Sequence, residues 1–150
     1  MTIERDLCAF AASEIAADAA LAMMRLSILD WSVCAIAGGP EPAARIVREM
    51  ILAEGSARQA TLVGCEARVP ARAAALVNGV ASHALDFDDT HFAHIGHPSV
   101  AVIPAALAIA ELPGASGLHF LHAALIGAEA STRVGVWPGR RPYRTERRRG

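Results

Sequence analysis

The strongest apolar pattern of the chain lies between residues 16 and 37, where hydrophobic side chains recur at helical spacing. They form two stripes, one of Leu21, Met24, Ile28, Trp31 and Ala35 and the other of Leu26, Leu29, Val33 and Ile36. A helix that is apolar on both sides is typical of a protein core. The pattern therefore predicts a central core helix. Gly38-Gly39-Pro40 ends it, because glycine supplies a left-handed cap and proline cannot continue a helix.

Five weaker helical patterns surround this segment and cover residues 3–14, 42–53, 73–83, 100–112 and 118–134. Ser116 is a suitable N-cap for the last of them, whose apolar face carries Leu118, Leu121, Leu125 and Ile126. Gly79 should let its helix approach a neighbour closely, and Pro104 should kink its helix or mark where regular geometry begins.

The segment Thr61 to Gly64 is too short to assign as a strand, and we expect an extended link there. The apolar faces of residues 16–37, 73–84, 100–112 and 118–134 need one another for burial. The sequence therefore predicts an all-α fold, a helical bundle over residues 1–136. Residues 137–150 lack apolar periodicity and should form an Arg-rich, disordered tail.

Composition and charge narrow the possible partners. Hydrophobic residues make up 53% of the 150 residues and charged ones only 19%, which suggests that some helix faces are covered by another subunit or by absent chain. Six of the fourteen basic residues lie in the tail, so residues 1–139 carry eight arginines against fourteen acids, a net charge of −6. Such a body would repel nucleic acid.

Nothing in the sequence favours export or a membrane. The first residues lack the basic start and apolar core of a signal peptide, and the apolar runs are interrupted by Gly, Pro or charge within ~18 residues. The three cysteines, Cys8, Cys34 and Cys65, are odd in number and widely spaced. We expect a protein of the reducing cytoplasm without a membrane partner.

The polar stretch from Ala84 to Ser99 concentrates the chemistry of the chain, with three carboxylates, three imidazoles and two hydroxyls between apolar segments. Pro98 steers His97 out of helical geometry, which leaves its ring accessible for proton transfer. Ser99 would cap the next helix, whose positive end would then favour a bound carboxylate. The stretch is therefore a candidate active-site loop, lining a cleft open to water.

Two other interpretations of this loop stay open. His91, His94 and His97 recur every three residues beside carboxylates, which is compatible with a metal site. Gly96 and Pro98 break that run, however, and zinc favours histidine pairs held rigidly, so we expect no metal. Asp88 and Asp89 could simply cap or solvate loop backbone.

The run from Val77 to His91, then His97-Pro-Ser, and the run from Val102 to Glu111 resemble the MmgE/PrpD family of dehydratases and decarboxylases. The similarity extends from Leu29-Asp30 through Gly127 and Glu129 to about Gly135. The resemblance implies much longer relatives, in which an α+β lid interrupts an all-helical domain. This chain would be the N-terminal part of that helical domain, without the lid.

By this resemblance, Asp86, Thr90 and His97 occupy catalytic positions, and we assign substrate binding to Ser99 and His91. His97 would exchange a proton with the substrate, Thr90 would hydrogen-bond a substrate carboxylate, and Asp86 would orient these groups. The family chemistry needs no metal or organic cofactor. Its further active-site His, Lys and Tyr would lie beyond residue 150, and the full-length enzymes would be homodimers.

The resulting hypothesis is a lyase, either a dehydratase or a decarboxylase, acting on a small di- or tricarboxylate such as 2-methylcitrate. No Lys or Arg occurs between Arg72 and Arg133, so these residues alone would hold a polyanion poorly. The tail departs from the family pattern after Gly135, as a frameshift or premature stop would produce. The alternatives are a metal-dependent helical hydrolase using the Asp/His loop, and a non-catalytic remnant of a broken gene.

If the remaining domain is absent, apolar side chains that it would cover should be exposed. We expect this of Val102, Leu107 and Ile109 on the fifth predicted helix.

Overall fold

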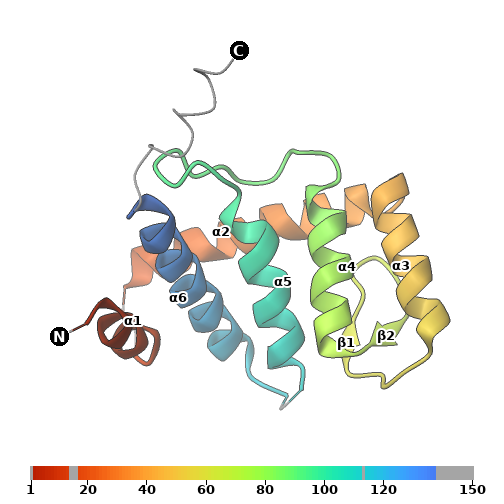
Figure 1. The fold of residues 1–150 in the computed structure, drawn as a ribbon, viewed down its shortest axis with the longest axis horizontal. Helices are drawn as coiled ribbons and strands as arrows, with labels where there is room; N and C mark the ends of the chain where they lie inside the picture. Colours follow the sequence, from red (N-terminus) through yellow and green to blue (C-terminus); the bar gives the residue numbers. More distant parts are fainter. Residues whose placement is uncertain (1, 14–16, 113, 138–150) are drawn as a thin grey trace.

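The computed structural model describes residues 2–13, 17–112 and 114–137, and in this part of the chain it contains six helices and one short hairpin (Figure 1). The elements are α1 (Ile3–Ala11), α2 (Asp18–Gly38), α3 (Pro42–Glu54), β1 (Ala60–Thr61), β2 (Arg68–Val69), α4 (Ala71–His83), α5 (Pro98–Ala110) and α6 (Gly117–Val136). The predicted all-α fold is confirmed. The expected disordered tail lies, apart from Trp137, outside the described residues.

The helices form two layers. α4, α5 and α6 lie side by side, and α2 crosses behind all three (Figure 1). α3 packs beside α4 at one end of this layer, and α1 contacts α6 at the other. The loop between α4 and α5 spans one end of the helices, so the candidate site sits at the edge of the bundle.

The long helix α2 is buried on one side only. Leu21, Met24, Trp31 and Ala35 are buried as predicted, against α4, α5 and α6. The second apolar stripe was also expected in the core, but each of its members is 58–61% exposed: Leu26, Leu29, Val33 and Ile36. The reason is that the described helices packed on α2 all lie on its other side.

By length and composition, α2 could cross a membrane, in contrast to the expectation that charge would interrupt every apolar run. This is weak evidence for a span, because core helices of soluble proteins have the same composition. Here Trp31 and Ala35 are almost fully buried inside the protein.

The end of α2 falls at Gly38, as predicted, but its glycines have a different role from the one expected. Gly39 has φ −54° and ψ −38°, so no left-handed cap forms there. Instead, a Cβ on Gly38 would overlap the backbone carbonyl oxygen of Ala81 in α4. Glycine is required at this position because it lets the two helices meet backbone to backbone.

α4 makes a second close approach, to α5. A Cβ on Gly79 would lie 3.1 Å from the carbonyl oxygen of Val100, which confirms the predicted role of this glycine. Helix α5 begins at Pro98 and continues through the buried Pro104. Since proline has no N–H to offer the carbonyl four residues earlier, Pro104 leaves the Val100 oxygen without its usual helical bond at the Gly79 contact.

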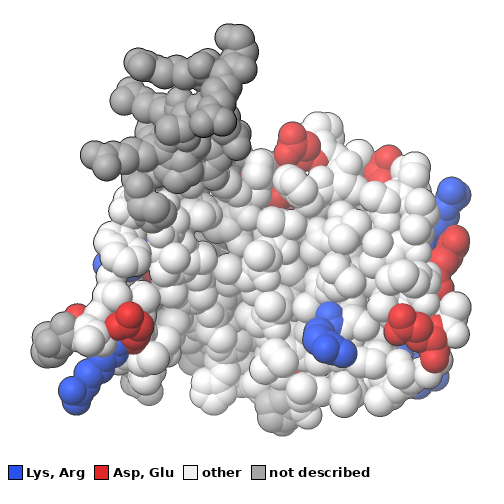
Figure 2. All heavy atoms as spheres, viewed as in Figure 1, with Lys and Arg blue, Asp and Glu red and all other residues white. Residues whose placement is uncertain are grey.

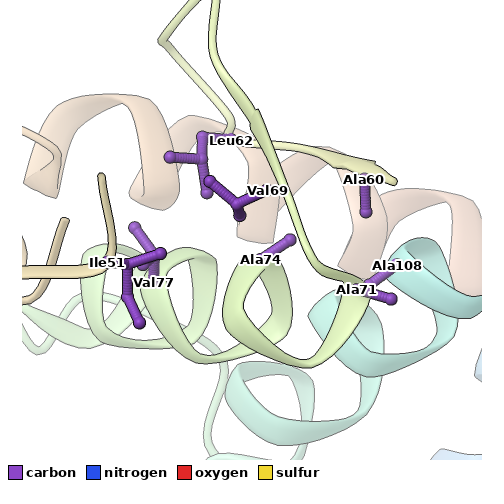
Figure 3. Close-up of a cluster of buried hydrophobic side chains, with 8 residues drawn as sticks. All are labelled: Ile51, Ala60, Leu62, Val69, Ala71, Ala74, Val77 and Ala108. Carbon is purple, nitrogen blue, oxygen red and sulfur yellow. The ribbon is translucent and has the colours of Figure 1, made fainter. Parts of the chain in front are cut away.

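The expected link after α3 contains a hairpin instead. Ala60 and Thr61 pair antiparallel with Arg68 and Val69. Its side chains join α3 and α4 in one buried cluster (Figure 3): Ile51, Ala60, Leu62, Val69, Ala71, Ala74, Val77 and Ala108. Asn78 anchors the hairpin to α4, because its Oδ1 accepts from Val63 N at 2.9 Å and its Nδ2 donates to the Thr61 carbonyl at 2.9 Å.

Much apolar surface stays open to solvent. Figure 2 shows a face whose centre is almost free of charge, with acids and arginines mainly towards its edges. Ile109 is 61% exposed as expected, whereas Val102 and Leu107 are half-buried. Ser116 caps α6 as predicted, accepting from His119 N. Leu118, which was assigned to the apolar face of this helix, is 56% exposed.

The contact at Gly38 gives a stability prediction. Gly38→Ala should lower the free energy of unfolding by about 1–3 kcal/mol or more, because the new methyl must displace the Ala81 carbonyl. Gly39→Ala is the matched control: its Cβ would keep 3.4 Å from the nearest oxygens, and its φ is one that alanine adopts. We expect it to be neutral or stabilising by up to about 1 kcal/mol. Urea unfolding followed by circular dichroism measures both, and equal effects would contradict this account of Gly38.

The cysteines should differ in reactivity. Burial, and then the negative charges of Asp30, Asp88 and Asp89, raise the pKa of the Cys34 thiol. At neutral pH Cys34 therefore holds less thiolate, the species that alkylating agents attack, than an exposed cysteine does. Iodoacetamide labelling read by peptide mass spectrometry should modify the exposed Cys8 first and Cys34 last. Labelling of Cys34 ahead of Cys8 in the folded chain would contradict the burial.

Candidate active site

The loop from residue 84 to 97 is held at both ends by helices, α4 ending at His83 and α5 beginning at Pro98. Its first turn closes when Asp86 N donates to the His83 carbonyl at 3.1 Å. Asp86 then adopts φ +57°, a left-handed conformation that aspartate tolerates better than most residues. This turn directs the loop back over the end of α4.

Asp88 is the buried acid of the loop, with a side chain fully excluded from solvent. Its Oδ1 and Oδ2 lie 2.9 and 3.1 Å from Nδ1 of His83. On the other side, Nδ1 of His97 lies 3.2 Å from the Asp88 carbonyl oxygen and 3.5 Å from Oδ2. A buried carboxylate is costly unless it is paired, and here two imidazoles surround it.

Asp86 and His97 come together as the sequence predicts. Nε2 of His97 lies 3.6 Å from Oδ1 of Asp86, whose side chain is 76% exposed. His97 itself is mostly covered, so its ring is fixed while the carboxylate beside it faces solvent. Thr90 is exposed, and the structure shows no hydrogen bond from it to either residue within the described chain. A substrate would have to bridge Thr90 to Asp86 and His97.

Ser99 does not cap α5 as predicted. His97 occupies the N-cap position and Pro98 begins the helix, which places Ser99 in the first turn. The cap is Asp89: its carboxylate accepts from Ser99 N at 3.2 Å and from Ser99 Oγ at 2.5 Å. The capping alternative for Asp89 is therefore confirmed, and an acid at the positive end of a helix is stabilising.

The two residues assigned to substrate binding line a separate pocket. Ser99 and His91, with Asp89, form part of a cavity of about 270 Å³ against α2 and α6. Glu129 and Thr132 of α6 also line it. The loop thus has two chemically distinct sides within the described chain, one with Asp86 and His97 and one with His91 and Ser99.

The three-histidine metal site suggested by spacing does not form in the described chain. His91 Nδ1 already accepts from His94 N at 3.1 Å, and the two rings stand 6.5 Å apart. The donors that converge are instead His83, Asp86, Asp88 and His97, with one ligand atom from each within 4.8 Å of the others. Two imidazoles and two carboxylates form a donor set compatible with zinc or a similar divalent ion.

Sequence reasoning missed His83 and misjudged Asp88. His83 counted only as the last residue of a helix. Asp88 was expected to cap or solvate loop backbone, but its side chain is buried against Nδ1 of His83 instead. A signal existed, since a histidine in the last turn of a helix lies close to a loop that must fold back over it. The residue that the loop brings onto the ring depends on the left-handed turn at Asp86, which the sequence pattern does not show.

The sequence profile of the MmgE/PrpD N-terminal domain matches residues 5–146. It continues past Gly135, where a departure from the family was expected, so that expectation finds no support.

Cis-aconitate decarboxylase of Homo sapiens is 46% identical over 71 residues, 45% of this chain and 15% of the human protein. The cis-aconitate decarboxylase-like protein oryM of Aspergillus oryzae is 31% identical over 130 residues, 82% of this chain and 27% of that protein. The chain thus spans between about one seventh and about one quarter of the length of these curated relatives.

Proposed function

Because this chain belongs to the MmgE/PrpD family, we propose that it supplies one wall of the active site of a lyase that dehydrates or decarboxylates a small di- or tricarboxylate. Cis-aconitate and 2-methylcitrate are the substrates that we consider first, the former because relatives are named for it. The observation that carries the proposal is the pairing of His97 with the exposed Asp86 on the loop between α4 and α5.

The chemistry needs one group that moves a proton beside the reacting carbon. In a dehydration, His97 would take the proton from the carbon next to a carboxylate. A general acid from outside this segment would protonate the hydroxyl, so that it leaves as water. In a decarboxylation, the same ring would return a proton to the carbon that loses carbon dioxide. Asp86, 3.6 Å from Nε2, would stabilise the protonated ring in either case.

The remaining assigned residues would hold the substrate. The exposed hydroxyl of Thr90 is free to donate to a carboxylate, and Ser99 and His91 border the neighbouring pocket. No Lys or Arg occurs between Arg72 and Arg133 in the sequence, and Arg133 is engaged with Glu129 at 3.2 Å. We therefore infer that the cations for the carboxylates come from outside this segment, in a cytoplasmic homodimer of a longer protein.

The proposal is tested with the chain alone and with a chimera in which it replaces the matching N-terminal segment of human cis-aconitate decarboxylase. We expect carbon dioxide release from cis-aconitate, or water loss from 2-methylcitrate, by the chimera only. His97→Gln in the chimera should lower kcat/KM by about 10²- to 10⁴-fold, the usual contribution of a general acid or base.

The matched control is His119→Gln, an exposed histidine at the start of α6, which should leave turnover unchanged. A folded chimera without activity on either acid would favour the non-catalytic remnant. Equal turnover in the His97 and His119 variants would exclude His97 from the chemistry.

A metal-dependent hydrolase stays as the second candidate, because four donors converge at His83, Asp86, Asp88 and His97. Under the lyase proposal, dialysis of the active chimera against a chelator should leave turnover unchanged. Turnover that falls on chelation and returns with Zn²⁺ would replace the metal-free mechanism.

A further inference from the structure

Asp88 is a buried acid to which the proposed lyase chemistry assigns no role. Its side chain has no exposed surface, and it meets two imidazoles, His83 at 2.9 Å and His97 at 3.5 Å. Asp86, which the sequence suggested as the orienting acid, is instead largely in solvent and on the opposite nitrogen of His97. The two acids therefore contact different ends of the same ring.

The groups around Nδ1 of His97 decide where its proton sits. Two atoms of Asp88 lie near this nitrogen, its carbonyl oxygen and Oδ2. The carbonyl oxygen always acts as an acceptor, and Oδ2 does so when the carboxylate is ionised, so neither can donate a hydrogen bond to Nδ1. Nε2 faces one acceptor, Oδ1 of the solvent-exposed Asp86, at 3.6 Å, whereas Nδ1 has two acceptors closer than that. The neutral ring is therefore expected to carry its hydrogen on Nδ1 and to keep the lone pair on Nε2. That lone pair lies on the side of Asp86 and the solvent, where a substrate would be.

His83 completes this arrangement. Its Nδ1–H donates to both oxygens of Asp88, which keeps the buried carboxylate paired and fixed. Its ring also lies against that of His97, with centroids 4.9 Å apart and planes tilted by 59°. It thus restrains both the acid and the imidazole that the acid orients.

We propose that Asp88 and His83 form a positioning pair that holds His97 in the Nδ1–H tautomer, with Nε2 ready to exchange a proton with the substrate. This proposal deepens the proposed lyase function, on which it rests. Neither member need touch the substrate, since both act through His97.

The distances favour this pair over a metal ion. Two ligands on a tetrahedral zinc, each about 2.0 Å from it, stand roughly 3.3 Å apart. His83 Nδ1 and Asp88 Oδ1 are closer, at 2.9 Å, which is the length of an N–H···O hydrogen bond. A metal would also need the lone pair of His83 Nδ1, where the hydrogen bond needs a proton.

The test is the tautomer of His97, which requires no turnover. Long-range ¹H–¹⁵N spectra of the labelled 150-residue chain distinguish the two neutral tautomers, and His83→Gln and His97→Gln variants assign the signals. We expect the Nδ1–H form in the wild-type chain. If Asp86 were the orienting acid, His97 would donate from Nε2 and show the opposite tautomer, which would overturn the proposal.

Variants then show which acid sets the tautomer of His97. Asp88→Asn should shift His97 towards the Nε2–H form, while Asp86→Asn should leave it at Nδ1–H. In the active chimera, Asp88→Asn and His83→Ala should lower kcat roughly 10- to 100-fold, as loss of an orienting partner does for metal-bound histidines, with KM little changed. His83→Gln, whose amide can still donate to Asp88, should recover part of this loss.

The outcomes separate the two proposals. An Nδ1–H tautomer that depends on Asp88, in a chimera without lyase activity, supports the pair and rejects the lyase. An active chimera whose kcat and tautomer ignore Asp88→Asn rejects the pair alone. Titration with Zn²⁺ is the last arm: stoichiometric binding that is lost in both Asp88→Asn and His83→Gln would show a metal site in place of the hydrogen-bonded pair.

Discussion

The close packing of α4 against two helices at once is the constraint on which the arrangement depends. Gly38 lets the backbone of α2 reach Ala81, and Gly79 lets the backbone of α5 reach α4 at Val100. Interiors are packed too densely for such contacts to shift without cost. Because Ala81 lies only two residues before His83, the contact that closes the bundle also fixes the first imidazole of the site.

The sequence predicted where the helices lie along the chain better than which of their faces are buried. Helical spacing located all six described helices, since periodicity depends only on local geometry. It could not say that Leu26 and Leu29 face solvent, because both stripes of α2 look equally apolar and only the positions of other helices decide between them. It also missed the hairpin, whose two-residue strands depend on the buried Asn78 rather than on their own pattern.

In the site, too, the sequence predicted local features but not the contacts that depend on the fold. Asp86 and His97 could be named because they match a family motif, and they do meet in the structure. Ser99 looked like an N-cap from its place after proline, yet the helix starts one residue before it and Asp89 takes that role. His83 and Asp88 could not be paired from the sequence, since the turn that joins them requires a non-glycine residue at positive φ.

Three aspartates within four residues thus have three separate environments, and this explains why the loop needs so many acids. Asp89 accepts hydrogen bonds from Ser99 at the start of α5, which holds one end of the loop. Asp88 is buried between two imidazoles, where removal of either partner would leave a charge poorly compensated. Only Asp86 remains in solvent, held by a strained turn beside Nε2 of His97. Under the proposed positioning role, Asp89 and Asp88 hold the loop and the ring of His97, and Asp86 is the acid of the three that a substrate could reach.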